Sequence, residues 1–140
     1  MKKNMAIISK VEYLGNLRTE LTHCKSGQQM YTDAPVDNNG KGEAFSPTDL
    51  VATSLASCMI TVMGIKAKHS GIEMDGTYAE VEKVMSAKPR KISGINIDIY
   101  FPKNYTENEK NILEITANTC PVINSLNPDI VKNINFHYQS

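Results

Sequence analysis

An uncharged segment, residues 50–65, constrains the fold of this 140-residue chain more than any other feature. A helix start precedes it: Ser46 can cap, Pro47 suits the first helical position, and Asp49 completes a Ser-x-x-Asp capping box. We predict a helix from this start to about His69. Its apolar residues go nearly all the way round, so other parts of the protein must cover it on every side.

One small sheet cannot cover such a helix alone. Ala52, Ala56 and Gly64 are small enough to let another helix approach closely, and we expect that helix to come from a second subunit. The uncharged segment is shorter than the roughly 20 residues needed to span a bilayer. We therefore interpret it as part of a buried core helix and expect no association with a membrane.

Charge and composition exclude several classes of protein. Fifteen Lys and Arg residues balance 15 Asp and Glu residues, so nothing in the charge favours nucleic acid or an anionic membrane as a partner. Hydrophobic residues make up 41% of the chain, and its length fits one domain over residues 1–140. Three cysteines are too few for a disulfide-stapled secreted scaffold, and the N-terminus has no apolar stretch long enough for a secretory signal. We expect a cytoplasmic protein with reduced or cycling thiols.

The rest of the sequence groups strands and helices. Strands are predicted at residues 5–13, 17–23, 29–32, 77–85, 92–101 and 131–138, a second helix at 106–119, and a loop at 34–45. The second helix begins with a capping box formed by Thr106 and Glu109. Its predicted apolar stripe consists of Ile112, Leu113, Ile115 and Ala117. This order favours an α+β fold with a largely antiparallel sheet.

Two cysteines have very different settings. Cys58 lies in the uncharged helix, where a cysteine often only fills space, although Ser57 and Thr61 could hydrogen-bond a thiolate. Cys120 either simply ends a helix or acts with Pro121, which can begin a new helical turn and bring the sulfur near free N–H groups. Such a pair suits a nucleophilic cysteine and a partner that resolves it by forming a disulfide.

Other kinds of site find little support in the sequence. Cys24, beside a hairpin turn, is interpreted as a bystander. His23, His69 and His137 are scattered, and no CxxC or HxxxH pair occurs, so we expect neither a metal nor a cofactor. No GxSxG or Walker A sequence occurs either.

Arg18 is one of only two arginines in the chain. A lone arginine on a strand is usually a solvated surface residue. It gains a function only if it folds over Cys58, where its fixed charge would lower the pKa of the thiol and hold a polar oxygen.

The segments 45–50 and 56–59, followed downstream by Cys120-Pro121-Val122, resemble the OsmC/Ohr family of peroxide-reducing proteins. The resemblance rests on the Ser-Pro-x-x-Leu helix start, the cysteine in that helix, the separation of the two cysteines and the Cys-Pro pair. It covers nearly the whole chain. It implies an OsmC-like α+β fold in which antiparallel sheets wrap two long central helices of an intertwined homodimer, with active sites at the subunit interface.

The resemblance also implies an activity, the thiol-dependent reduction of hydroperoxides and preferably of organic ones. Cys58 would attack the peroxide and become a sulfenic acid, and Cys120 would condense with it to a disulfide. An external dithiol would then reduce the pair. The peroxide site would lie between the Cys58 helix and the loop 35–45.

An arginine and a carboxylate support the thiolate in this family. Arg18 is the match for the arginine, and Asp49 is the match for the carboxylate. In the Ohr pattern the carboxylate directly follows the proline, where this chain has Thr48, and Glu43 in the preceding loop is the second candidate. Asp49 already has a structural role as a helix cap.

Two other functions stay open for the same scaffold. An apolar pocket at the interface could hold a small hydrophobic ligand without catalysis, the thiols being merely buried. A redox sensor is the other alternative, and it would need a separate output partner.

Overall fold

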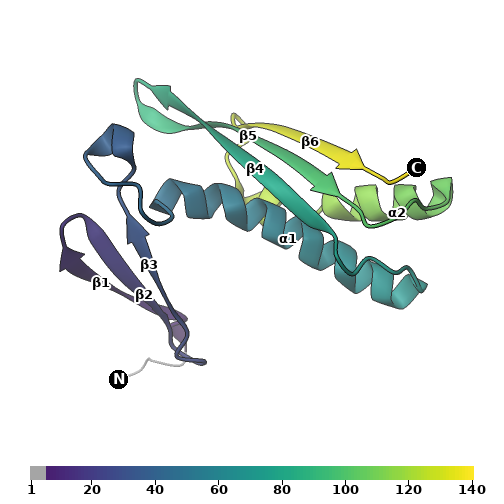
Figure 1. Cartoon of the computed structure of the whole chain (residues 1–140), viewed down its shortest axis with the longest axis horizontal. Helices are drawn as coiled ribbons and strands as arrows, with labels where there is room; N and C mark the ends of the chain where they lie inside the picture. Colours follow the sequence, from purple (N-terminus) through teal and green to yellow (C-terminus); the bar gives the residue numbers. More distant parts are fainter. Residues whose placement is uncertain (1–5) are drawn as a thin grey trace. The chain divides into compact units, whose positions relative to one another are not determined.

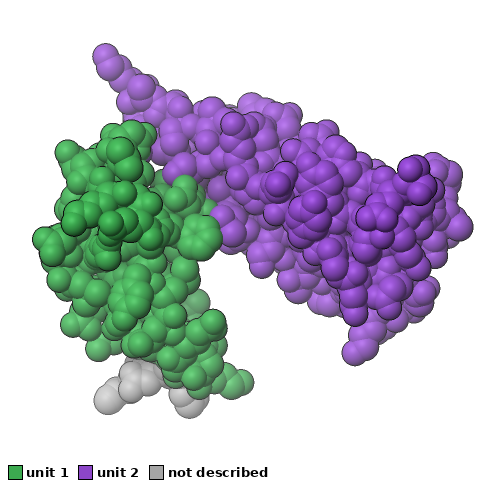
Figure 2. Space-filling model, viewed as in Figure 1, with its two compact units in different colours: residues 1–50 green, residues 51–140 purple. Residues whose placement is uncertain are grey.

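The computed structural model describes residues 6–140 (Figure 1). The chain forms two compact units, residues 1–50 (unit 1) and residues 51–140 (unit 2), coloured separately in Figure 2. The boundary between them falls inside the long helix α1 (Pro47–Ser70). The single domain expected over residues 1–140 stays a prediction.

Unit 1 contains a three-stranded antiparallel sheet in the order β1-β2-β3. Its strands are β1 (Ser9–Gly15), β2 (Arg18–His23) and β3 (Gln29–Asp33), which form the predicted meander. The predicted first strand began at residue 5, which lies outside the described residues, and β1 begins only at Ser9. The loop after β3 contains a turn of 3-10 helix, η2 (Val36–Asn38).

The turn between β1 and β2 includes Leu17, which the sequence placed in a strand. Asn16 and Leu17 have φ values of 56° and 64°, and Gly15 pairs directly with Arg18. Two successive positive φ values match the twist of the flanking strands in a two-residue hairpin. The hairpin geometry therefore outweighs the usual preference of leucine for negative φ.

Unit 1 buries no large apolar side chain within residues 6–50. Its buried residues are Thr32, Asp33 and Ser46, all polar. The exposed large apolar residues of this segment are Ile7, Ile8, Val11, Tyr13, Leu14, Leu17, Met30, Tyr31, Val36 and Phe45. Because a small sheet needs a packed apolar face for independent stability, this sheet requires a surface beyond itself.

Unit 2 contains a second three-stranded sheet in the order β4-β5-β6. Its remaining elements are β4 (Tyr78–Ala87), β5 (Arg90–Tyr100), α2 (Glu107–Ala117), α3 (Pro121–Ser125) and β6 (Val131–His137). β4 and β5 form an antiparallel hairpin, whereas β6 runs parallel to β5 after a crossover through α2 and α3 (Figure 1). Three of the four strand pairings among residues 6–140 are antiparallel, as expected.

The predicted helix starts are confirmed. Ser46 Oγ accepts a hydrogen bond from the Asp49 N–H at 3.1 Å, and Asp49 Oδ2 accepts one from the Ser46 N–H at 3.0 Å. Thr106 and Glu109 form the same reciprocal pair before α2. In each box, two side-chain oxygens accept hydrogen bonds from two backbone N–H groups that would otherwise have no acceptor at the helix start.

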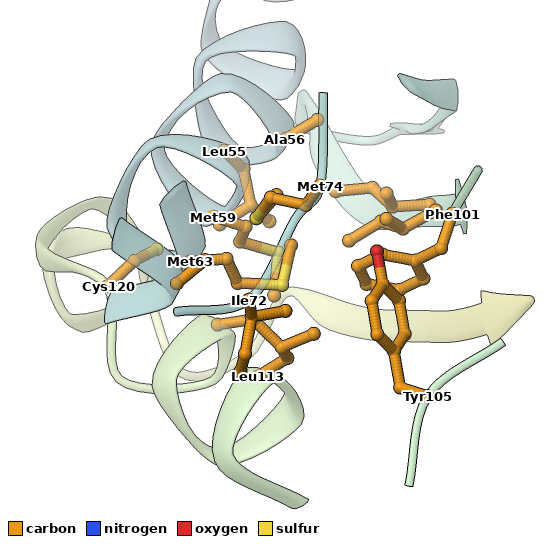
Figure 3. Packing of buried hydrophobic residues seen from close by; sticks show 14 of the residues in the cluster. Leu55, Ala56, Met59, Met63, Ile72, Met74, Phe101, Tyr105, Leu113 and Cys120 are labelled. Atoms are coloured by element: carbon orange, nitrogen blue, oxygen red, sulfur yellow. The ribbon is translucent and has the colours of Figure 1, made fainter. Parts of the chain in front are cut away.

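The core of unit 2 lies between the two longer helices and one face of the sheet. Figure 3 shows Leu55, Met59 and Met63 of α1 beside Leu113 of α2, and all four are fully buried. The β5 side chains that complete this core are Ile95, Ile97 and Ile99. Each buried side chain of this size contributes about 1.5–3 kcal/mol.

One residue of the predicted apolar stripe of α2 lies outside the core. Ile115 is 67% exposed, whereas Leu113 and Ala117 are fully buried. A helix turns by about 100° per residue, so Ile115 lies about 200° around the helix from both buried residues. Its place in the predicted stripe was therefore wrong.

Helix α1 is long and apolar enough to cross a membrane by length and composition alone, with a mean hydropathy of 1.6. At 24 residues it is longer than the uncharged segment at its centre. Core helices of water-soluble proteins meet the same criterion, and side chains along one side of α1 are buried in the core of unit 2. The criterion is therefore weak evidence for a membrane span.

Candidate functional site

Cys58 is half-buried near the middle of α1. It shares a helix face with Ser54 and Thr61, both exposed, because side chains three and four residues apart lie on the same side. The Thr61 hydroxyl donates its proton to the Ser57 carbonyl oxygen at 2.8 Å. Thr61 therefore has no proton left for a Cys58 thiolate, and that part of the prediction was wrong.

Cys120 is fully buried and caps the short helix α3. Its sulfur accepts a hydrogen bond from the Ile123 N–H at 3.4 Å, and Pro121 follows as the first helical residue. Pro121 therefore begins a new helical turn, as the sequence predicts, and that turn brings N–H groups to the Cys120 sulfur.

The structure brings Cys58 and Cys120 together, although they are far apart in the sequence. Cys58 lies close enough to Cys120 to affect the pKa of the Cys120 thiol, and neither cysteine belongs to a disulfide. Burial raises the pKa of the Cys120 thiol, the neighbouring Cys58 raises it further, and the Ile123 N–H opposes both. Cys120 is therefore a neutral thiol near pH 7, and the catalytic roles of the two residues stay predictions.

Arg18 belongs to an ion-pair cluster in unit 1. It lies opposite Asp33 in the β2–β3 register, with 3.5 Å between Arg18 Nη2 and Asp33 Oδ2. It also forms an ion pair with Glu43 from the loop. Of the two carboxylates considered from the sequence, Glu43 is thus an arginine partner, and Asp49 belongs to the capping box of α1. Whether Arg18 folds over Cys58 stays a prediction.

Asp33 is the member of this cluster that sequence reasoning missed. It is fully buried, its Oδ2 accepts the Glu43 N–H at 3.0 Å, and its Oδ1 has no hydrogen-bond partner among the described residues. The Glu43 N–H lowers the pKa of Asp33 most, and Arg18 adds to this effect against the opposing effect of burial. The β2–β3 hairpin register, which sets Asp33 opposite Arg18, is the signal that could have identified it.

The loop that holds Glu43 is shaped by two glycines. A Cβ atom at Gly40 would lie 1.7 Å from the Ala34 carbonyl oxygen, so only glycine fits there. Gly42 has φ 65° and donates its N–H to the Ala34 carbonyl oxygen at 3.2 Å. Because the loop folds back to Ala34 at these glycines, the N–H of the next residue, Glu43, reaches the Asp33 carboxylate.

The third cysteine and the histidines, to which the sequence analysis assigned no role, have local surroundings of their own. Cys24 is exposed near the β2–β3 turn, where His23 Nδ1 and Ser26 Oγ are 2.7 Å apart. His137 Nε2 lies 2.8 Å from Asp98 Oδ1 on the second sheet. Within residues 6–140, no three or more His, Cys, Asp or Glu side chains are grouped as metal ligands would be.

Comparisons with known proteins identify relatives of this chain. The family model of the OsmC-like proteins matches residues 40–135. A candidate osmotic stress induced and detoxification response protein of Psychrobacter arcticus is 50% identical to the chain. That alignment covers 98% of this chain and 100% of the other, with a TM-score of 0.92. No curated protein matches the sequence.

Structures of lower identity share the fold. The organic hydroperoxide resistance protein OsmC of Legionella pneumophila is 19% identical over 96% of this chain and 99% of that chain, with a TM-score of 0.74. The organic hydroperoxide resistance protein OhrB of Bacillus subtilis is 17% identical over 93% and 98%, with a TM-score of 0.62. The predicted α+β fold is thus confirmed, and the chain belongs to the OsmC-like protein family.

Proposed function

We propose that this protein is a thiol-dependent hydroperoxide reductase in which Cys58 reacts with the peroxide and Cys120 resolves the product. The proximity of these two thiols, one half-buried and one fully buried, is the observation that supports it most. Membership of the OsmC-like family adds support, because relatives of the same fold are described as organic hydroperoxide resistance proteins.

In the first step the Cys58 thiolate attacks one oxygen of the hydroperoxide. The O–O bond breaks as an S–O bond forms, so the sulfur loses two electrons and becomes a sulfenic acid. The peroxide is reduced, and its leaving alkoxide takes a proton to become an alcohol.

In the second step Cys120 attacks the sulfur of the Cys58 sulfenic acid. An S–S bond forms and the S–O bond breaks, and hydroxide leaves with the Cys120 proton as water. Because the two thiols are already near each other, the step needs no large movement of α3. An external dithiol then returns both cysteines to thiols by exchange, which suits a reducing, cytoplasmic location.

Exposure and acidity divide the two roles between the cysteines. Cys58 is accessible enough for a peroxide to reach, whereas Cys120 is closed off from solvent. Its raised pKa keeps Cys120 protonated, and a protonated thiol is a poor nucleophile toward peroxide. Cys120 thus reacts with the Cys58 sulfenic acid after it has formed and does not compete with Cys58 for the peroxide.

The ion-pair cluster of unit 1 is proposed to complete the site. Asp33 and Glu43 both pair with Arg18 and hold its guanidinium in one orientation. A fixed guanidinium beside Cys58 would stabilise the thiolate and bind the peroxide oxygens. Asp33 and Glu43 act here as positioning residues, and Asp49 acts through the start of α1.

A homodimer is proposed to cover the exposed apolar surfaces. Val51 and Ile65 lie on the exposed side of α1, and the sheet of unit 1 has no apolar core within residues 6–50. A second copy of the chain would bury both surfaces, as the two central helices of the intertwined dimer require.

The test combines thiol counting with peroxide consumption. Reduced protein treated with cumene hydroperoxide should lose two thiols per chain without crosslinks between chains. Cys58→Ser should abolish peroxide consumption. Cys120→Ser should complete one turnover and stall as a sulfenic acid, which dimedone would trap.

Cys24→Ser is the matched control, because Cys24 is an exposed cysteine with no role in this proposal. It should keep full activity and still lose two thiols. Full activity of Cys58→Ser would refute the mechanism. Thiol titres unchanged by the peroxide would instead support non-catalytic binding on this scaffold.

A further inference from the structure

Three rings lie side by side across the second sheet. Tyr78, Tyr100 and His137 occupy paired positions on β4, β5 and β6. The centroids of Tyr78 and Tyr100 are 5.0 Å apart with an interplanar angle of 20°. Those of Tyr100 and His137 are 4.7 Å apart at 16°. The three side chains therefore form one nearly parallel aromatic stack.

This stack borders a cavity at the end of the sheet where β4 begins and β5 and β6 end. The cavity has a volume of about 320 Å³. Its walls include the three stacked rings, Phe101, Tyr138 and the backbone of Gly76. Most of its wall is thus aromatic, and its volume is at the lower end of the range of small-molecule sites.

Carboxylates make this aromatic wall electronegative. Asp98 Oδ1 lies 2.8 Å from His137 Nε2, and Glu80 is directly opposite Asp98 in the β4–β5 register. Burial raises the pKa of Tyr100 most, and the charges of Glu80 and Asp98 raise it further, which shows that both are close to the stack. Glu80 and Asp98 lie two residues from Tyr78 and Tyr100 on their strands, so both carboxylates share the face of the sheet that carries the stack.

The rings of this cluster already hold cations of the chain itself. Lys110 Nζ lies 4.7 Å from the centroid of Tyr138, which also lines the cavity. Lys103 Nζ lies 5.8 Å from the centroid of the neighbouring Tyr105. Both distances are within the range of cation–π attraction, in which the electron-rich ring face binds a positive charge.

We propose that this cavity binds a small organic cation carrying a methylated ammonium group. The methyl groups would contact the outer ring faces at the two ends of the stack, those of Tyr78 and His137, because Tyr100 lies between these two rings. Glu80 and Asp98 would supply the long-range attraction. The cavity is not part of the thiol pair: it lies at the end of β6, whereas Cys120 precedes the start of that strand. Binding is therefore expected in the protein whether or not its thiols reduce peroxide.

Amide NMR with two probes of equal shape tests the role of charge. Choline should shift the amide signals of Gly76, Tyr100 and Gln139, which surround the cavity. The neutral isostere 3,3-dimethylbutan-1-ol should leave them unchanged at the same concentration and ionic strength. Equal shifts with both probes, or none with choline, would overturn the proposal.

Tyr78→Leu tests the aromatic wall, and it should fold because the Tyr78 side chain is 56% exposed. It should weaken choline binding about two- to five-fold, the usual contribution of an exposed cation–π contact. Tyr13→Leu removes a tyrosine of similar exposure, 65%, from unit 1 and should leave the affinity unchanged. Unchanged affinity in Tyr78→Leu, or an equal loss in both variants, would overturn the proposal.

Asp98→Asn tests the charge separately. It keeps the shape of the side chain and its position next to His137 but removes the negative charge. Choline binding should weaken by about two-fold or more, as expected for a partly exposed charge pair. An affinity equal to that of the unmodified protein would refute the electrostatic part.

Discussion

The two units of the chain are stabilised in different ways. Unit 2 packs α1 and α2 on its sheet, with Met59, Ile97 and Leu113 fully buried. Within residues 6–50, unit 1 has a sheet of the same number of strands but buries only polar side chains. A three-stranded sheet in this chain therefore does not by itself indicate that apolar side chains are buried against it. Unit 2 has an apolar core of its own, whereas unit 1 depends on surfaces beyond its own sheet.

The chemistry follows the same division. Unit 2 provides two thiols in largely apolar surroundings, and unit 1 provides a cluster of charged groups around Arg18. A buried carboxylate such as Asp33 is tolerated because it accepts an N–H and faces a guanidinium. The proposed reaction draws on both kinds of residue.

The largest expected effect comes from truncating matched methionines in the two units. Met59 is 0% exposed and Met30 is 37% exposed. Met59→Ala should lower the free energy of unfolding by about 2–5 kcal/mol, because it removes buried volume and leaves a cavity. Met30→Ala should cost about 0.5 kcal/mol or less at protein concentrations where the chain is monomeric. Urea unfolding would measure both.

Equal losses in these two variants would break the comparison. They would show that Met30 is as well packed in solution as Met59. In that case a partner surface covers Met30 tightly, and the measurement should be repeated at several protein concentrations to detect it.

A somewhat smaller effect is expected from a charge on the exposed side of α1. Ile65 is 56% exposed, so Ile65→Glu should fold but should weaken the proposed dimer, where this side chain would be buried. Light scattering should show a shift toward the monomer. Amide exchange should then rise in β1–β3 more than in β4–β6, because unit 1 has less core to protect it.

Ile115→Glu is the control for this variant. Ile115 is 67% exposed on α2, and it lies outside the proposed dimer contact. It should leave both the molecular mass and the exchange pattern unchanged. A dimer that persists in Ile65→Glu with normal exchange would rule out this side of α1 as the subunit contact.

Local signals allowed much of the fold to be predicted from sequence. The capping boxes at Ser46 and Thr106 involve neighbouring residues only, and the structure contains both. The prediction for Thr61 failed because its hydroxyl donates to the Ser57 carbonyl oxygen, one helical turn earlier. This backbone acceptor competes with the Cys58 sulfur for the same proton. The parallel pairing of β6 was not foreseen, since hairpins dominate the rest of the chain.

The candidate site was only partly accessible to sequence reasoning. The proximity of Cys58 to Cys120 was expected from a family resemblance, because spacing alone cannot bring α1 and α3 together. Asp33 was missed because it was treated as the end of a strand and not as a partner of Arg18. Counting outward from the β2–β3 turn gives that pairing, since each step along one strand is matched on the other.

The smallest expected effect concerns the pH dependence of unit 1. The folded protein lowers the pKa of Asp33 below its ordinary value of 3.8, chiefly through the Glu43 N–H. The stabilisation is thus present above pH 3.8 and is lost as the pH falls through the lower, folded value. Asp33→Asn should increase amide exchange in the Glu43 loop at pH 7, and the difference from the unmodified protein should shrink in acid. Asp129→Asn, at an exposed site, should show no such difference at either pH. A difference for Asp33→Asn that stays constant down to pH 3 would mean that the shape of the side chain, and not its charge, holds the loop.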